Sequence, residues 1–67
     1  MMNQREKIIA YVEQNGSITS YDAYEKLGIT QLGARIFELK RDGYCISAMW
    51  KENPRTGKHY VEYKIVR

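Results

Sequence analysis

The spacing of apolar residues changes once along the chain, near residue 43. Before this point apolar residues recur three and four positions apart, which is the period of a helix packed along one face. After it they alternate with polar residues, which is the period of a strand. The pattern therefore predicts a helical segment followed by paired strands.

A first helix is predicted over residues 4–15. Asn3 followed three residues later by Glu6 resembles a capping box, in which the Asn side-chain oxygen accepts a hydrogen bond from the Glu6 backbone amide. Gly16 supplies the left-handed residue that ends many helices. Residues 17–19 include two β-branched side chains and predict a short extended segment that is able to join a sheet edge.

A second, shorter helix is predicted over residues 20–27. Thr19 and Asp22 stand in the cap and N3 positions, and Gly28 ends the helix. Ile29 is expected to be a buried turn residue. The connection to the next helix is therefore tight.

A third helix is predicted over residues 31–42, with Thr30 as its N-cap and Gly43 at its end. Its inward stripe consists of Leu32, Ile36 and Leu39. The residues that point away from the core on a helical wheel are Gln31, Ala34, Glu38 and Arg41, with Arg35 and Phe37 on the two flanks. This outward face is the part of the helix that is open to a partner.

Two segments in which apolar and polar residues alternate, one on either side of a turn, predict a β-hairpin. The turn covers residues 53–58, where Pro54 fixes φ and Gly57 supplies a positive φ. Pairing residues whose numbers sum to 111 places the apolar side chains on one side of the hairpin, as Ile46 with Ile65, Ala48 with Tyr63, and Trp50 with Val61. We expect these six residues to face the core.

Length and composition predict one small folded domain over residues 1–67. The chain of 67 residues lies below the usual domain size of about 100–150, and its 43% hydrophobic content is typical of folded proteins. The longest apolar run, residues 8–12, is far shorter than the roughly 20 residues that span a bilayer, and the N-terminus lacks a signal-peptide pattern. We expect a cytoplasmic protein that does not associate with membranes. The single cysteine, Cys45, excludes an intramolecular disulfide.

The net charge of +3 is a weak indication of an anionic partner, but the distribution of charge is more informative. Residues 1–34 have a net charge of −1, and residues 35–67 have a net charge of +4. The positive field therefore belongs to the third helix and the hairpin. An uneven scatter of solvated charges is the alternative explanation.

The order helix, short strand, helix, helix, hairpin resembles the winged helix-turn-helix DNA-binding domains. The likeness depends on the tight turn of Leu27, Gly28, Ile29 and Thr30 and on the basic hairpin tip. Residues 17–44 are similar to the small helix-turn-helix proteins encoded by phages and prophages, and the likeness continues through the hairpin. The resemblance implies an α+β fold of three helices, a short strand after the first helix, and a C-terminal two-stranded wing.

The resemblance also implies a function, which is sequence-specific binding of double-stranded DNA by a phage or prophage transcriptional regulator. The helix over residues 31–42 would enter the major groove, and the tip over residues 53–58 would contact the backbone or the minor groove. The implied DNA-binding residues are Thr30 for a phosphate, Gln31 for adenine, Arg35 for guanine, and Arg41, Arg55 and Lys58. A chain this small would gain affinity as a homodimer on two half-sites.

Each implied DNA contact has an ordinary structural alternative. In this alternative, Arg35 only pairs with a carboxylate on the first or second helix, and Gln31 is a tolerant first-turn residue. In the same way, Arg55 and Lys58 only keep the hairpin tip solvated.

Two residues of the outward face fit DNA binding poorly. Glu38 would repel phosphates unless it accepts a hydrogen bond from cytosine N4. Phe37 is expected at the edge of the core, with a protein-binding patch as the alternative. Together with Met49, they favour a second interpretation, in which the same fold is a protein-interaction module. A small phage factor that inhibits or redirects a host nucleic-acid enzyme would be of this kind.

The residues that could carry out catalysis are few and far apart. Cys45 and His59 are the only candidates for a thiol–imidazole pair, and the predicted register separates them by about 20 Å or more. One histidine and one cysteine do not make a structural zinc site, and no glycine-rich phosphate loop is present. We therefore expect no enzymatic activity, no cofactor and no metal. The tyrosines are expected mainly in the core with solvated hydroxyl groups, except for an outward-facing Tyr60.

Overall fold

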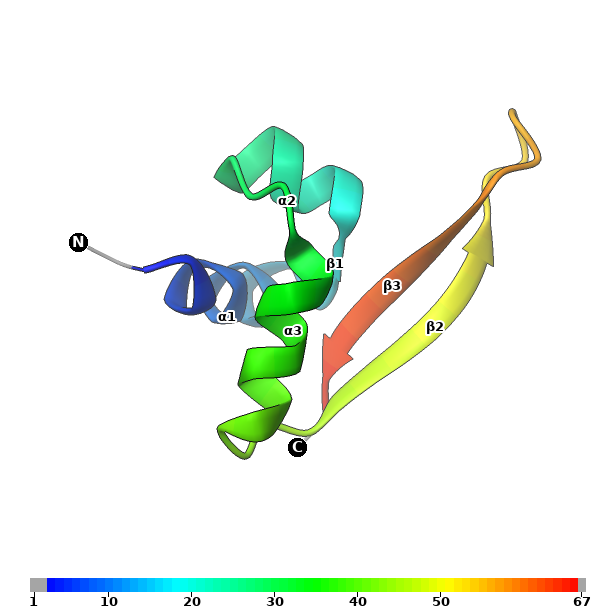
Figure 1. Ribbon diagram of the computed structural model, residues 1–67. Coiled ribbons are helices and arrows are strands. Elements are labelled where there is room, and N and C mark those ends of the chain that lie inside the picture. Colours follow the sequence, from blue (N-terminus) through cyan, green and yellow to red (C-terminus); the bar gives the residue numbers. More distant parts are fainter. Residues whose placement is uncertain (1–2, 67) are drawn as a thin grey trace.

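Three helices pack on one face of a three-stranded antiparallel sheet in the computed structural model, which describes residues 3–66 (Figure 1). The helices are α1 (Gln4–Asn15), α2 (Ser20–Leu27) and α3 (Leu32–Arg41), and the strands are β1 (Ile18–Thr19), β2 (Ile46–Glu52) and β3 (His59–Ile65). The strand order is β1-β3-β2, so that β3 lies between the short strand and its hairpin partner. This is the predicted α+β architecture.

The bounds of α1 and α2 agree with the prediction because their end signals are local. Asn3 Oδ1 accepts a hydrogen bond from the Glu6 amide at 2.8 Å. At α2 the capping box is complete, since Thr19 Oγ1 accepts from the Asp22 amide and Asp22 Oδ2 accepts from the Thr19 amide, both at 3.1 Å. Gly28 then ends α2 with a φ of 68°, which a residue with a Cβ adopts only at a cost.

The third helix is shorter than predicted by one residue at each end, and Thr30 is not its N-cap. The cap position is Gln31, which has φ −124° and ψ 62° and makes no side-chain capping hydrogen bond. Between the buried Ile29 and the buried Leu32, the chain runs along the surface at Thr30 and Gln31, and the helix begins only after Gln31. Thr30 consequently lies one residue too far from the first-turn amides to cap them.

The hairpin has the predicted register at every pair from Ile46↔Ile65 to Glu52↔His59. The ladder continues beyond the strands, where the Val66 amide donates to the Cys45 carbonyl at 2.7 Å. On the other edge of β3, Ile18 pairs with Tyr63, which confirms that the segment after α1 joins the sheet. The register also places Cys45 and His59 at opposite ends of the hairpin, so these two residues cannot form a dyad.

The core consists of aliphatic side chains from the helices, β1 and the α2–α3 turn. Its buried members are Ile8, Val12, Ile18, Ala23, Ile29, Leu32, Ile36 and Leu39, which include the whole predicted stripe of α3. The hairpin adds only partly buried residues to this core, which are Ile46, Tyr63 and Ile65. The core therefore lies at the base of the hairpin.

Two predictions about burial are wrong. Trp50 is 74% exposed and Ala48 is also exposed, because the hairpin extends past the helices that would cover its inner face (Figure 1). Most tyrosines are exposed as well, namely Tyr21, Tyr24, Tyr44 and Tyr60, of which only Tyr60 was expected outside. Aliphatic residues already fill the small core, and only Tyr11 and Tyr63 among the tyrosines pack against it.

Candidate nucleic-acid interface

The solvent-facing side of α3 is largely uncharged over its first two turns. Gly33, Ala34 and Phe37 are exposed there, Leu32 and Ile36 are buried in the core, and Arg35 is half-buried. Phe37 is 66% exposed, so its predicted place at the edge of the core is wrong. Its position about 140° from the buried stripe of α3 carries the ring into solvent, since successive helical residues turn by about 100°.

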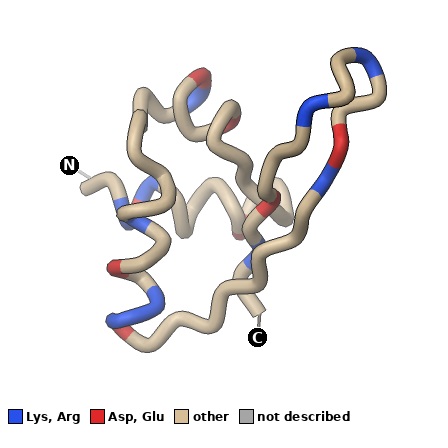
Figure 2. The backbone as a smooth tube through the Cα atoms, turned by 45° about the vertical axis from the view of Figure 1, so that its right-hand side comes forward, with Lys and Arg blue, Asp and Glu red and all other residues tan. Residues whose placement is uncertain are grey.

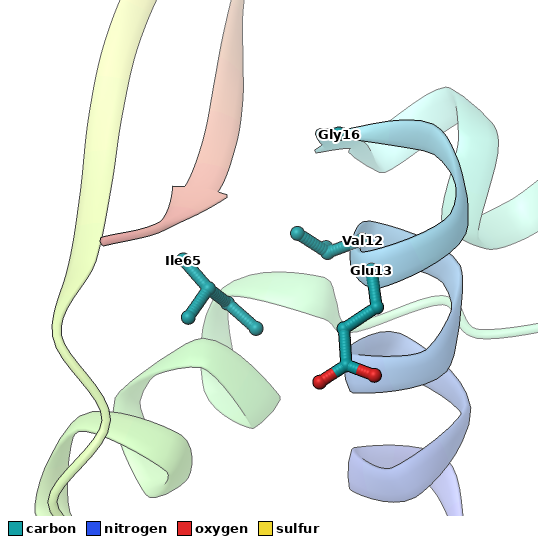
Figure 3. Close-up of a pocket in the computed structure, with 4 residues that line it drawn as sticks. All are labelled: Val12, Glu13, Gly16 and Ile65. Carbon is teal, nitrogen blue, oxygen red and sulfur yellow. The ribbon is translucent and has the colours of Figure 1, made fainter. Parts of the chain in front are cut away.

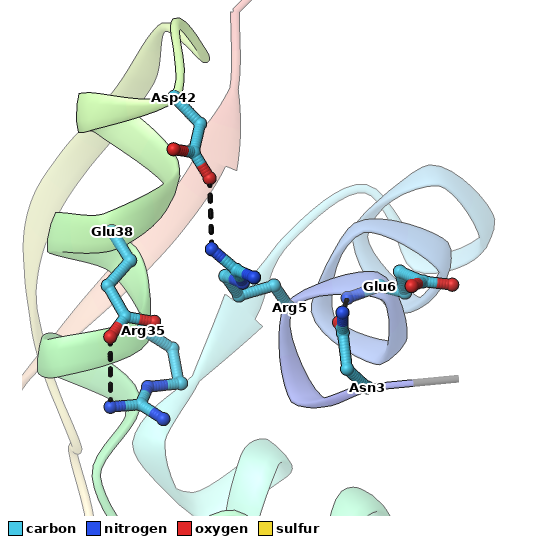
Figure 4. Close-up of polar contacts among 6 residues, drawn as sticks. All are labelled: Asn3, Arg5, Glu6, Arg35, Glu38 and Asp42. Atoms are coloured by element: carbon cyan, nitrogen blue, oxygen red, sulfur yellow. Dashed lines mark hydrogen bonds and ion pairs between the residues drawn. The ribbon is translucent and has the colours of Figure 1, made fainter. Parts of the chain in front are cut away.

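Arg35 forms an ion pair within α3 and not with α1 or α2 (Figure 4). Its Nη2 lies 3.2 Å from Glu38 Oε2, one turn further along the helix. Its Nε is buried without a hydrogen-bond partner among the described residues. Arg35 is therefore only partly available to a ligand, and Glu38 neutralises its charge.

A second ion pair connects α3 to α1 on the same flank. Arg5 Nη1 lies 3.1 Å from Asp42 Oδ2, just after the last residue of α3 (Figure 4). Both side chains are well exposed, so this pair contributes about 0–1 kcal/mol at most. It shows that the flank carrying Arg35, Glu38 and Asp42 is the one turned toward α1.

The end of α3 carries cations that are available to a ligand. Lys40 and Arg41 occupy the last turn and are exposed, and neither has an ion pair within residues 3–66. Cations at this end also interact favourably with the helix dipole. Arg41, which was predicted as a DNA contact, is therefore presented to solvent.

The hairpin tip carries the second group of available cations, Arg55 and Lys58. The tip is ordered by its own hydrogen bonds, in which the Asn53 amide donates to the Lys58 carbonyl at 2.8 Å and Asn53 Oδ1 accepts from the Arg55 amide at 2.9 Å. Neither cation has an ion pair within the described residues. Figure 2 shows Lys and Arg at the hairpin tip and at the far end of α3, on opposite ends of the molecule.

A cleft of about 850 Å³ separates the hairpin tip from the start of α2. Arg55 and Lys58 line it on one side and Tyr21 on the other, with Tyr60 from β3. The carboxylates of the cleft have other partners, since Asp22 accepts from the Thr19 amide and Glu62 lies 3.9 Å from Lys64 Nζ. Tyr21 was not predicted as a site residue, because only the pairing of β1 with β3 brings the start of α2 near the tip.

The remaining predicted site residues lie at separate places. Thr30 and Gln31 are exposed at the start of α3. Met49 is 47% exposed on β2, on the side of the sheet turned away from the helices. Phe37 and Met49, which were both predicted as contacts of a protein partner, therefore do not share a face.

A smaller hollow of about 330 Å³ lies between the end of α1 and the end of β3, lined by Val12, Glu13, Gly16 and Ile65 (Figure 3). Glu13 is the titratable side chain that lines it among the described residues. Within residues 3–66, no group of three or more potential metal ligands comes together, and none of the helices is long and apolar enough to cross a membrane.

Comparison with known proteins agrees with this architecture. A family model described as a winged helix-turn-helix domain matches residues 3–67. Searches among curated proteins and solved structures found no significant match. The family match covers nearly the whole chain, and the three helices, the short strand after α1 and the C-terminal hairpin are the parts that the sequence resemblance implied. The chain belongs to the winged helix-turn-helix domain family.

Proposed function

We propose that this protein binds double-stranded DNA sequence-specifically and acts as a cytoplasmic transcriptional regulator of a phage or prophage. In this proposal α3 enters the major groove, and the hairpin tip, residues 53–58, contacts the backbone or the minor groove. The contacts would come from the predicted residues Thr30, Gln31, Arg35, Arg41, Arg55 and Lys58. The exposed free thiol of Cys45 suits a reducing compartment.

The observation that carries the proposal is the placement of available cations at the two ends of the molecule. Lys40 and Arg41 end α3, and Arg55 and Lys58 lie at the tip (Figure 2). The long axis of the molecule is 36 Å, which is about one turn of B-DNA, roughly 34–36 Å. A single copy therefore has the size and charge to hold the backbone on both sides of one major-groove contact.

The salt dependence of duplex binding tests this proposal. Four phosphate contacts give a slope of log affinity against log salt of about −3.6, or a loss of roughly 150-fold between about 50 and 200 mM salt. Arg55→Ala should make the slope less negative by about 1. The measurement is fluorescence anisotropy with a duplex enriched from a random library.

Lys7→Ala is the matched control for the salt experiment. Lys7 is exposed on α1 and carries the same charge, but it lies outside both cation groups. We expect the slope to stay unchanged in this variant. A slope near zero in the wild type, or equal effects of Arg55→Ala and Lys7→Ala, would contradict the proposal.

The exposure of Phe37 favours a second candidate function, a protein-interaction module that inhibits or redirects a host nucleic-acid enzyme. An apolar ring this exposed is common at protein interfaces. Under this alternative, Phe37→Ala abolishes capture of an identified nucleic-acid enzyme, and the wild type binds no duplex. Clear duplex binding with unchanged capture by Phe37→Ala would exclude it.

A further inference from the structure

The part of α3 that faces solvent offers apolar contact where a groove-reading helix usually offers hydrogen bonds. Over its first two turns the exposed residues are Gly33, Ala34 and Phe37, and none of them has a polar side chain. The polar residues within the same turns, Arg35 and Glu38, are half-buried and pair with each other at 3.2 Å. Gln31, at the cap position, is the nearest exposed amide side chain.

The charges beside this surface favour a nucleic acid over a protein as its occupant. Phe37 lies three and four residues before Lys40 and Arg41, so all three are neighbours on one side of the helix. Neither cation has an ion pair within the described residues. A polyanion would neutralise these cations, and its apolar groups would then lie against Ala34 and Phe37.

Thymine presents such a group in the major groove, because it carries a methyl at C5 where the other common bases do not. Apolar side chains such as Ala and Phe contact this methyl. The glutamine at the cap position suits the adenine of the same base pairs, through the N6 and N7 atoms. Both features point to A·T pairs.

We infer that α3 recognises the 5-methyl groups of thymine through Ala34 and Phe37, and that these contacts select A·T pairs under the helix. This inference rests on the proposed DNA-binding function and names the base chemistry that it reads. Phe37 is then a specificity-determining residue whose exposure serves the groove contact. Arg35, restrained by Glu38, contributes less to base selection.

Replacing thymine by uracil in the target removes only the methyl group and tests the inference directly. The probe is the duplex enriched from a random library. It is synthesised with thymine throughout, and then as a series in which one thymine at a time is replaced by deoxyuridine. Substitution under α3 should weaken wild-type binding roughly fourfold for each methyl that is buried. Substitution elsewhere in the duplex should leave the affinity unchanged.

Phe37→Ala should lose most of the difference between thymine and uracil duplexes. Tyr24→Ala is the matched control, since it removes an equally exposed aromatic side chain from α2 and should keep the difference. Both side chains are outside the core, and circular dichroism verifies that both variants remain folded.

The outcomes separate failure of the inference from failure of the proposed function. Equal wild-type affinity for thymine and uracil duplexes would overturn the inference while DNA binding stands. An unchanged thymine preference in Phe37→Ala would also overturn it and would assign Phe37 to another surface, such as a protein interface. Absence of binding to any selected duplex would overturn both.

Discussion

Arg35 shows how a single neighbour limits what a side chain can do. Glu38 takes one guanidinium nitrogen at 3.2 Å, and Arg35 Nε is buried with no hydrogen-bond partner within the described residues. The pair is about 70% buried on each side, which weakens the competition from water. A ligand must therefore displace Glu38 before it can use the full fork of donors on Arg35.

Under the proposed DNA-binding function, Glu38→Gln should strengthen duplex binding several-fold, because it removes a negative charge from the helix that enters the groove and releases Arg35. The salt slope should become more negative by about 1, as one further cation reaches the backbone. Thermal stability should change little, since a pair one turn apart on a helix contributes about 0.2–0.5 kcal/mol. Anisotropy across salt and thermal melting measure the two effects.

Glu25→Gln is the control for this prediction, since it makes the same charge change on an exposed residue of α2. We expect it to raise the affinity much less than Glu38→Gln. Weaker duplex binding by Glu38→Gln would instead indicate that Glu38 accepts a hydrogen bond from cytosine N4.

The two threonines before α2 and α3 differ in a way that stability measurements can detect. Thr19→Ala removes the capping box of α2 and should lower the free energy of unfolding by about 1 kcal/mol. Thr30→Ala removes a side chain that caps nothing in α3 and should cost less than about 0.5 kcal/mol. Urea unfolding followed by circular dichroism compares them. Equal losses would contradict the assignment of Gln31 as the cap position.

At the scale of the elements, the sequence predicts what depends on neighbours along the chain. Local signals place these parts correctly. The caps at Asn3 and Thr19 mark the starts of α1 and α2, and the alternation of apolar and polar residues gives the register of β2 and β3. The start of α3 was misplaced by one residue, because it follows a turn whose Ile29 is buried among other elements and no side-chain cap marks it. Tertiary context overrides local signals at such points.

The same limit explains why Trp50 was wrongly predicted to face the core. Alternation shows which side of a strand a residue occupies, but it does not show whether another element covers that side. Ile46 and Ile65 pack against the core, whereas Trp50, nearer the tip of the hairpin, is exposed. For the site, the third helix and the tip were predictable from local pattern, whereas the cleft with Tyr21 depends on the β1–β3 pairing.

Trp50 and Leu39 provide a test of where the core ends. Leu39 is 1% exposed, and Leu39→Ala should lower the free energy of unfolding by about 2–5 kcal/mol. This loss is comparable to the whole stability of a domain this small, which is roughly 3–5 kcal/mol. Trp50→Ala removes an exposed ring with one edge contact to His59 and should cost less than about 1 kcal/mol. Urea unfolding followed by circular dichroism distinguishes the two variants. A large loss of unfolding free energy in Trp50→Ala would contradict the exposed position of Trp50 in the hairpin.

At the scale of the whole molecule, size limits how much DNA one copy can read. The 36 Å long axis covers about one turn of the duplex, so in the proposed binding mode one copy makes one major-groove contact and a few phosphate contacts. Site selection in a genome requires more than a single contact of this kind, because non-specific sites are in large excess. Two copies on adjacent half-sites would supply the missing specificity.

A tandem protein tests this limit. Two copies joined by a flexible linker of about 40 residues, whose mean reach of roughly 35 Å spans one duplex turn, should bind a duplex with two half-sites about 10² to 10⁴ times more tightly than a single copy does. On a duplex with one half-site the tandem should gain little, because its second copy finds only non-specific DNA. Titration of both duplexes by anisotropy gives the ratio. Equal affinity of the tandem for the two duplexes would show that one copy already reads the whole site.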